Sequence, residues 1–148
     1  MRGRAQLRRQ LDGYLSRVAA EVARAMEREA AAIVAQMRQV VPVESGALRD
    51  SIGWTWDTPP KGALTIGTFR GRKGSGMRIT LYAGTRDKTL GAGDAFYAAW
   101  QEFGTATAAA QPYFWPVWRA NRSRIRAAIA RAIRTATRAE AAKYAGRR

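Results

Sequence analysis

The sequence predicts one α+β domain of 148 residues, in which two long helices enclose a small antiparallel β-sheet. Three observations support this fold class. Apolar residues recur at helical spacing over residues 1–40 and again over residues 112–145. Between them, short segments alternate apolar and polar side chains and are separated by glycine and proline. The order helix, sheet, helix allows both helices to cover the same face of the sheet.

The first helix is predicted over residues 1–40, where apolar side chains recur at steps of three, four and seven residues. They are Leu7, Leu11, Leu15, Val18, Val22, Met26, Ile33, Met37 and Val40. Pro42 ends the helix because proline disfavours helical geometry at the residue before it. Unbroken from Leu7 to Val40, the helix would be about 50 Å long, which exceeds the width of a domain with a radius of gyration near ~15 Å. Two alternatives follow: Gly13 breaks the helix, or its first turns project and pack on a neighbouring subunit.

The middle of the chain, residues 41–110, is predicted to contain the sheet. A short helical turn opens this region, with Ser45 as its N-cap. Alternating or apolar segments follow at residues 53–57, 62–68, 77–84 and 95–100. We expect a sheet of about four antiparallel strands, with flexible loops at residues 69–76 and 85–94.

The last helix, over residues 112–145, is strongly basic. Residues 111–148 carry ten basic side chains and one acidic one. Arginine occurs on most turns, at Arg119, Arg122, Arg124, Arg126, Arg131, Arg134 and Arg138. Such a face is either simply solvated or contacts the DNA backbone or an acidic partner. No base-reading motif accompanies it, so any contact with DNA is expected to be independent of sequence and strongly salt-dependent.

The composition excludes most enzyme classes. The chain has 26 Lys and Arg residues against 11 Asp and Glu, a net charge of +15, and no His or Cys. It therefore has no disulfide, no Cys or His metal site and no Ser–His–Asp triad. Its carboxylates form no recognisable spaced pair, and residues 71–76 lack the spacing of a phosphate-binding loop. We expect no enzymatic activity, no catalytic, cofactor-binding or metal-ligating residues, and no membrane span, since no run of ~18 apolar residues occurs.

Two motifs resemble those of tailed-phage neck and tail-completion proteins, the family that includes minor tail protein Z. The first motif consists of Pro42, Ser45, Gly46, Leu48, Arg49, Ser51 and Ile52. The second consists of Tyr97, Glu102, Phe103, Gly104 and Thr105, followed by Pro112, Phe114 and Pro116. The two motifs occur in order and at family-like spacing, and the resemblance covers about residues 40–118.

We read these motif residues as defining the fold. Gly46 and Gly104 are expected at backbone turns. The apolar members are expected in the core, at Leu48, Ile52 and Phe103. An ion pair between Arg49 and Glu102 would join the two motifs.

The resemblance implies a structural protein of the virion, assembled in the host cytoplasm. It would form a homo-oligomeric ring, expected to be a hexamer, at the head–tail junction, with DNA passing through it. Its neighbours would be a connector or stopper and the tail tube. Its position as stopper, terminator or completion protein stays open, as does its origin in a phage, a prophage or a gene-transfer particle. The alternative is a free-standing DNA-binding protein without sequence preference, which the net charge alone supports.

Overall fold

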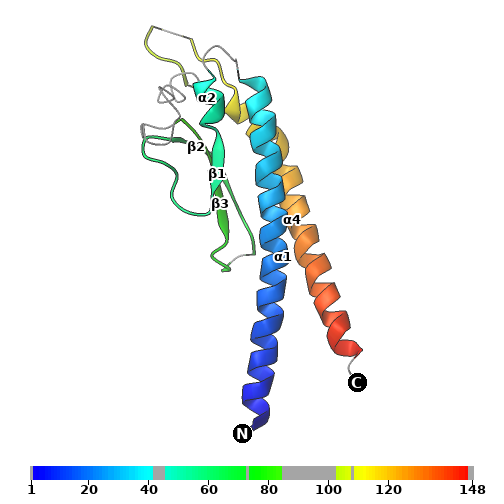
Figure 1. Cartoon of the computed structure of the whole chain (residues 1–148). Coiled ribbons are helices and arrows are strands. Elements are labelled where there is room, and N and C mark those ends of the chain that lie inside the picture. The colour runs from blue at the N-terminus through cyan, green and yellow to red at the C-terminus, as the bar shows by residue number, and fades with distance from the viewer. Residues whose placement is uncertain (1, 42–45, 73, 85–102, 108, 147–148) are drawn as a thin grey trace.

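The computed structural model describes residues 2–41, 46–72, 74–84, 103–107 and 109–146. Its elements are α1 (Arg2–Val40), α2 (Ala47–Asp50), β1 (Gly53–Thr55), β2 (Leu64–Arg70), β3 (Arg78–Ala83) and α4 (Phe114–Ala145). The two long helices lie side by side, and the sheet lies against one side of the pair (Figure 1). The predicted α+β fold class is therefore confirmed.

Helix α1 is continuous across Gly13, so the alternative in which this glycine breaks the helix is wrong. Its 39 residues span about 58 Å at ~1.5 Å per residue. One glycine costs a helix only about 1 kcal/mol relative to alanine. Contacts with α4 on both sides of the glycine stabilise this stretch: the Gln10 carbonyl accepts a hydrogen bond from Tyr144, and Arg17 pairs with Glu140.

The sheet has the strand order β1-β3-β2 and is antiparallel throughout. The described residues contain three strands where about four were predicted, and the candidate segment 95–100 and the loop 85–94 lie outside them. Strand β1 ends at Thr55, whose hydroxyl accepts a hydrogen bond from the Asp57 amide. Strand β2 continues through Arg70, so the loop that was predicted over 69–76 begins two residues later.

Both helices cover the inner face of the sheet, as the element order predicted. The core lies between the helices and the sheet, and both layers contribute fully buried side chains to it: Met26, Ile33, Met37, Ile52, Ile66, Ile79, Leu81, Phe114 and Ile125. Helix α4 approaches β2 most closely at Gly67, where a Cβ atom would lie 2.5 Å from the Trp118 ring. Only glycine fits at this position without a shift of the indole.

The sheet covers only part of the helix pair. The first turns of α1 and the last turns of α4 extend together beyond it, at the lower end of Figure 1. These turns run antiparallel and are joined by a 3.0 Å hydrogen bond from the Tyr144 hydroxyl to the Gln10 carbonyl. We call this part of the helix pair the two-helix arm. The apolar face of α1 therefore continues past the end of the sheet that would cover it.

Candidate interaction surfaces

The first motif forms a structural link between α2 and β3. Gly46 has a φ of 67°, a left-handed conformation that favours glycine, and Leu48 and Ile52 are buried, as predicted. The Ser51 hydroxyl donates a 2.6 Å hydrogen bond to the Leu48 carbonyl and accepts a 2.8 Å bond from the Gly84 amide. Ser51 therefore joins this turn to the end of β3. Two further motif members, Pro42 and Ser45, lie outside the described residues, and the N-cap of α2 is Gly46 rather than Ser45 as predicted.

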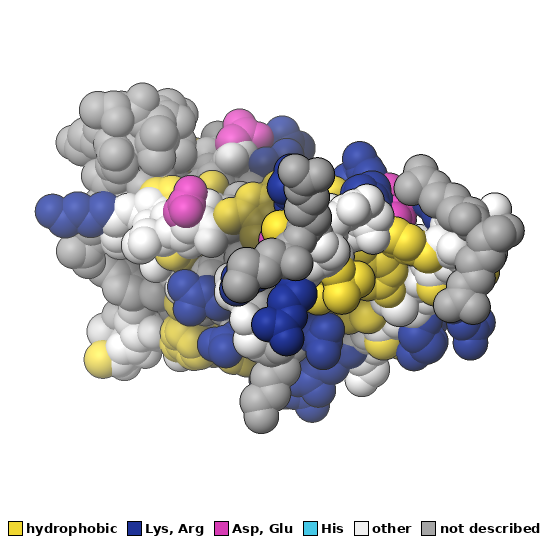
Figure 2. All heavy atoms as spheres, turned by 90° about the horizontal axis from the view of Figure 1, so that it is seen from below, with side chains coloured by type: hydrophobic (Ala, Val, Ile, Leu, Met, Phe, Trp, Pro, Cys, Tyr) yellow, Lys and Arg dark blue, Asp and Glu magenta, His cyan; other side chains and the backbone are white. Residues whose placement is uncertain are grey.

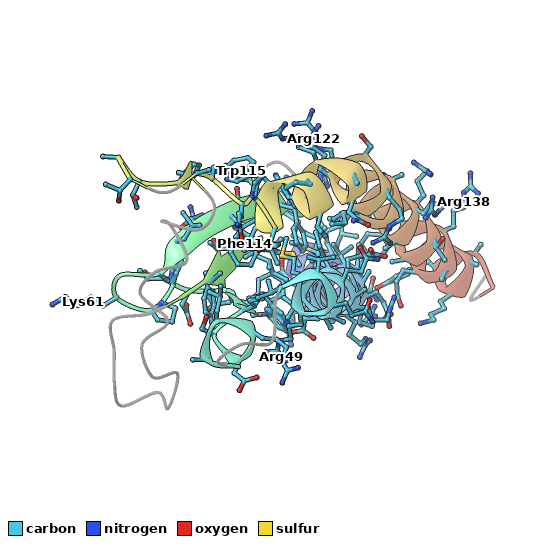
Figure 3. All side chains as sticks on the ribbon, turned by 90° about the horizontal axis from the view of Figure 1, so that it is seen from above. Arg49, Lys61, Phe114, Trp115, Arg122 and Arg138 are labelled. Carbon is cyan, nitrogen blue, oxygen red and sulfur yellow. The ribbon has the colours of Figure 1, made fainter. Side chains whose placement is uncertain are left out.

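The second motif is only partly as predicted. Gly104 has the expected positive φ, 76°. Phe103 was expected in the core, but 62% of its surface is exposed, so that prediction is wrong. Among the described residues of this motif, Phe114 fills the core: it is fully buried in the first turn of α4 and points to the interior in Figure 3. Pro116 lies in the same turn, where a helix has no partner for a backbone N–H.

The remaining members of this motif precede α4 in the sequence. Pro112 is exposed before α4, and the Thr105 hydroxyl accepts a 3.3 Å hydrogen bond from the Thr107 amide. Tyr97 and Glu102 lie outside the described residues. The ion pair between Arg49 and Glu102 therefore stays a prediction, and the contact that the structure gives Arg49 is with Asp50 at 3.7 Å.

The seven arginines of α4 are all exposed, but they are not equivalent. Arg124 belongs to the contact between the long helices, because it donates a 2.6 Å bond to Glu29 of α1. Arg119 lies over the Trp115 ring, 5.9 Å from its centroid. Within the described part of the chain, the other five make no ion pair: Arg122, Arg126, Arg131, Arg134 and Arg138. Figure 3 shows Arg122 and Arg138 pointing away from the helix pair.

A second basic surface, to which the sequence analysis gave no binding role, lies on the hairpin of β2 and β3. Arg70 and Arg78 are partners in the strand register, and with Arg72 they line a hollow of about 550 Å³. Trp56, Met77 and three loop glycines complete its lining. A signal was present in the sequence, because arginines that flank a hairpin loop at equal distances face each other. Seen from the arm end, basic side chains dominate the surface and acidic ones are few (Figure 2).

A buried carboxylate fixes the arm. The Glu140 side chain is 8% exposed and lies 2.7 Å from Arg17 of α1 and 2.6 Å from Lys143 of α4. Hydrogen bonds from Lys143 and then from Arg17 hold the pKa of Glu140 below its ordinary value. Sequence analysis could have found the pair of Glu140 and Lys143 by its spacing of three residues, but not the contact with Arg17.

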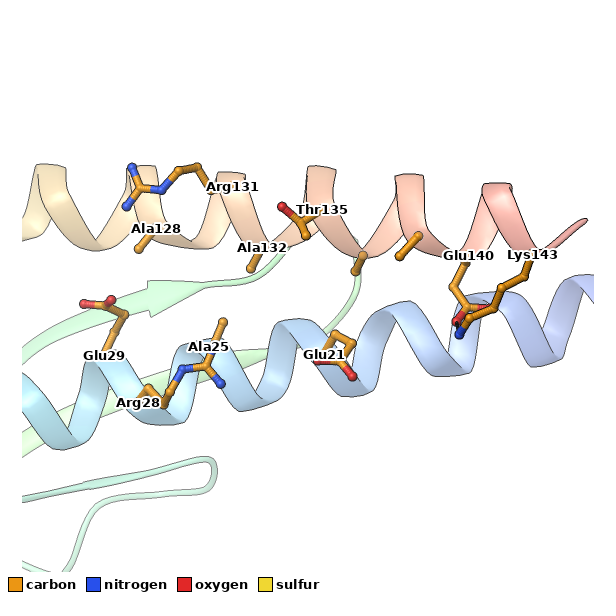
Figure 4. Close-up of a pocket in the computed structure, with 12 residues that line it drawn as sticks. Glu21, Ala25, Arg28, Glu29, Ala128, Arg131, Ala132, Thr135, Glu140 and Lys143 are labelled. Atoms are coloured by element: carbon orange, nitrogen blue, oxygen red, sulfur yellow. Dashed lines mark hydrogen bonds and ion pairs between the residues drawn. The ribbon is translucent and has the colours of Figure 1, made fainter. Parts of the chain in front are cut away.

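Between the two long helices runs a groove of about 570 Å³ (Figure 4). Its floor is formed largely by alanines, and its rim carries charges of both signs. Among the carboxylates on the rim, Glu29 pairs with Arg124 and Glu140 pairs with Arg17 and Lys143. The third carboxylate of the lining, Glu21, pairs with Arg24.

An exposed apolar surface lies along the arm. Leu7, Leu11 and Leu15 of α1 are 66%, 55% and 48% exposed. The third of them also lines a groove of about 470 Å³, whose lining includes Val18, Val22 and Ile133 of the helices and Arg72 and Met77 of the hairpin. Large exposed apolar patches of this kind mark protein–protein contacts.

Two classes of site find no support in the described part of the chain. No three acidic, His or Cys side chains come together there as they would around a metal ion. None of its helices is both long and apolar enough to cross a bilayer.

The described residues present an exposed apolar stripe on α1 and basic faces on α4 and the β2–β3 hairpin, which are features of proteins that bind other macromolecules. The chain belongs to the HK97-gp10-like family, described as "Bacteriophage HK97-gp10, putative tail-component", whose model matches residues 5–104. The protein is thus a structural component of the phage tail, and the resemblance drawn from the two motifs is confirmed. The match includes nearly all of α1 but ends before α4 and before the Pro112–Pro116 part of the second motif. Comparisons with curated proteins and with solved structures found no match.

Proposed function

We propose that the protein is a ring-forming subunit of the head–tail junction, in which each copy packs on the next through the two-helix arm. The ring is expected to be a hexamer, to surround the DNA, and to contact a connector or stopper on one side and the tail tube on the other. The family assignment supports a place in the virion among other tail proteins. The observation that carries the ring proposal is the exposed stripe of three leucines on a helix that extends beyond its own sheet.

The stripe favours a neighbouring protein over solvent for an energetic reason. Full burial of one leucine side chain contributes about 1.5–3 kcal/mol, so the three together are a substantial part of an interface. A contact between the arm of one copy and a different surface of the next is heterologous, and such contacts close into rings when the rotation permits. The basic outer surface of α4 is then available to a phosphate or carboxylate surface inside the same assembly.

We also propose that the protein has no catalytic role. The chain lacks His and Cys, and several of its described carboxylates are held in ion pairs: Glu21, Glu29, Asp50 and Glu140. Among them, Glu140 has its pKa held below the ordinary value by Lys143 and Arg17, which makes it a poor general base near neutral pH.

The test is the oligomeric state of the purified chain by native mass spectrometry and electron microscopy. The wild-type protein is expected to form rings, and the variant L7Q/L11Q/L15Q is expected to be monomeric with unchanged helix content by circular dichroism. The matched control, A5Q/S16Q/A20Q, introduces the same three side chains at exposed positions on the other side of the helix and should still form rings. A wild-type protein that stays monomeric, or a leucine variant that forms rings, contradicts the proposal.

A further inference from the structure

The hairpin of β2 and β3 brings like charges together. Arg70 and Arg78 are registered partners at the end of the two strands, and both side chains are exposed. Their strand neighbours, Phe69 and Ile79, are buried and also paired, so the two arginines emerge together on the outer face. The Cβ atoms of such partners lie only about 4.5–5.5 Å apart, and like charges at this spacing are destabilising.

The loop between them keeps open space beside these charges. It is closed by hydrogen bonds from the Gly71 amide to the Met77 carbonyl and from Ser75 to the Arg72 carbonyl, which hold Arg72 on the hairpin. Gly74 and Gly76 have φ values of 82° and 72°. A Cβ atom at either glycine would meet no atom within 4 Å. At these two glycines, therefore, no described side chain obstructs a polymer backbone that approaches the three guanidinium groups.

The charges of the hairpin are not neutralised within the described part of the chain. None of its three arginines makes an ion pair there. The carboxylate that contacts a residue of the hollow is Glu27, which accepts a 3.0 Å hydrogen bond from the Trp56 indole. Arg17 and Arg124 show the other arrangement, in which an arginine bonds directly to a carboxylate.

We propose that this hairpin binds the phosphate backbone of duplex DNA without reading its sequence. One guanidinium group can donate two parallel hydrogen bonds to two oxygens of a phosphate. A DNA duplex carries closely spaced phosphates, so several arginines can bind to it at once. The net charge of +15 attracts a polyanion over a long range. Bound phosphate also removes the repulsion between Arg70 and Arg78. This inference rests on the proposed function for the presence of DNA. Its site adjoins the arm, because Arg72 and Gly74 line one groove with Leu15, and the two proposals are tested with different variants.

The test compares two variants that remove the same charge. R70Q/R72Q/R78Q removes three arginines from the hairpin, and R131Q/R134Q/R138Q removes three from the exposed side of α4. Affinity for a short labelled duplex is measured by fluorescence anisotropy over a range of salt concentrations. The hairpin variant should lose at least about tenfold in affinity, and its slope of log affinity against log salt should fall by about three, at roughly 0.9 per phosphate contact. The α4 variant should lose clearly less.

Further measurements keep the result unambiguous. R70Q alone should melt no lower than the wild type without DNA, because it relieves the repulsion, and this shows that the hairpin remains folded. Polyglutamate and free phosphate should compete weakly with the duplex. Equal losses in the two triple variants, unchanged binding by the hairpin variant, or competition by polyglutamate as strong as by DNA overturns the inference. Native mass spectrometry of the same samples reports ring formation separately, so a failed ring and a failed DNA site are distinguishable.

Discussion

The two halves of the helix pair are held together by different forces. Beside the sheet, α1 and α4 enclose side chains such as Met26, Ile33 and Ile125 that have no exposed surface. In the arm, the same two helices are joined by Arg17, Glu140 and the tyrosines near them, while the leucines on the apolar face stay exposed. One half gains its stability from its own core, whereas the other relies on polar contacts within the chain and leaves its apolar surface exposed.

The largest effect that this comparison predicts is on stability. Ile33→Ala should lower the free energy of unfolding by about 2–5 kcal/mol, because it leaves a cavity in a fully packed region. Leu11→Ala, measured by urea unfolding under dilute monomeric conditions, should cost about 0.5 kcal/mol or less, because that side chain is already 55% exposed. Similar losses at the two positions would show that the arm has a core of its own and would remove the contrast.

A smaller effect is expected at the link between the first motif and the sheet. Ser51→Ala should destabilise the protein by about 1–3 kcal/mol, because the buried Gly84 amide loses its acceptor and the change does not replace it. Ser51→Thr keeps the hydroxyl and provides a control for its loss. Urea unfolding checks the prediction, and a loss that Ser51→Thr reproduces in full would assign the effect to packing rather than to the hydrogen bond.

Sequence analysis was most accurate where one helix or turn decides the outcome. Helical spacing places Val22 and Ile33 in the core because a side chain on the apolar side of a long helix has few alternatives. The left-handed conformation of Gly46 is likewise local. Phe103 was misplaced because its exposure depends on how its segment packs, which spacing does not encode.

The contacts that define the two interaction surfaces depend on pairing across the fold. The opposition of Arg70 and Arg78 requires the register of two strands, and the bond between Arg17 and Glu140 joins residues 123 positions apart. Neither the strand register nor the contact between these remote residues can be predicted from a single sequence. The distribution of charge along the sequence did predict a basic surface, but it placed that surface on α4. One of the seven arginines there, Arg124, forms an ion pair with Glu29.

The smallest effect concerns the polar contacts of the arm and their dependence on pH. Lys143 and Arg17 hold the pKa of Glu140 below its ordinary value of 4.5, so the unfolded chain binds this proton more tightly than the folded protein does. The stability that this carboxylate contributes is therefore present above its ordinary pKa and is lost as the pH falls through its lower folded value. The raised pKa of Arg17 adds nothing in this range, because the guanidinium is protonated in both states. The difference in melting temperature between the wild type and Glu140→Gln should then be constant near neutral pH and shrink in acid. Glu21→Gln, at an exposed ion pair of α1, is the control and should show a smaller difference at every pH. A Glu140→Gln difference that does not change with pH would mean that packing, and not charge, holds the two helices of the arm together.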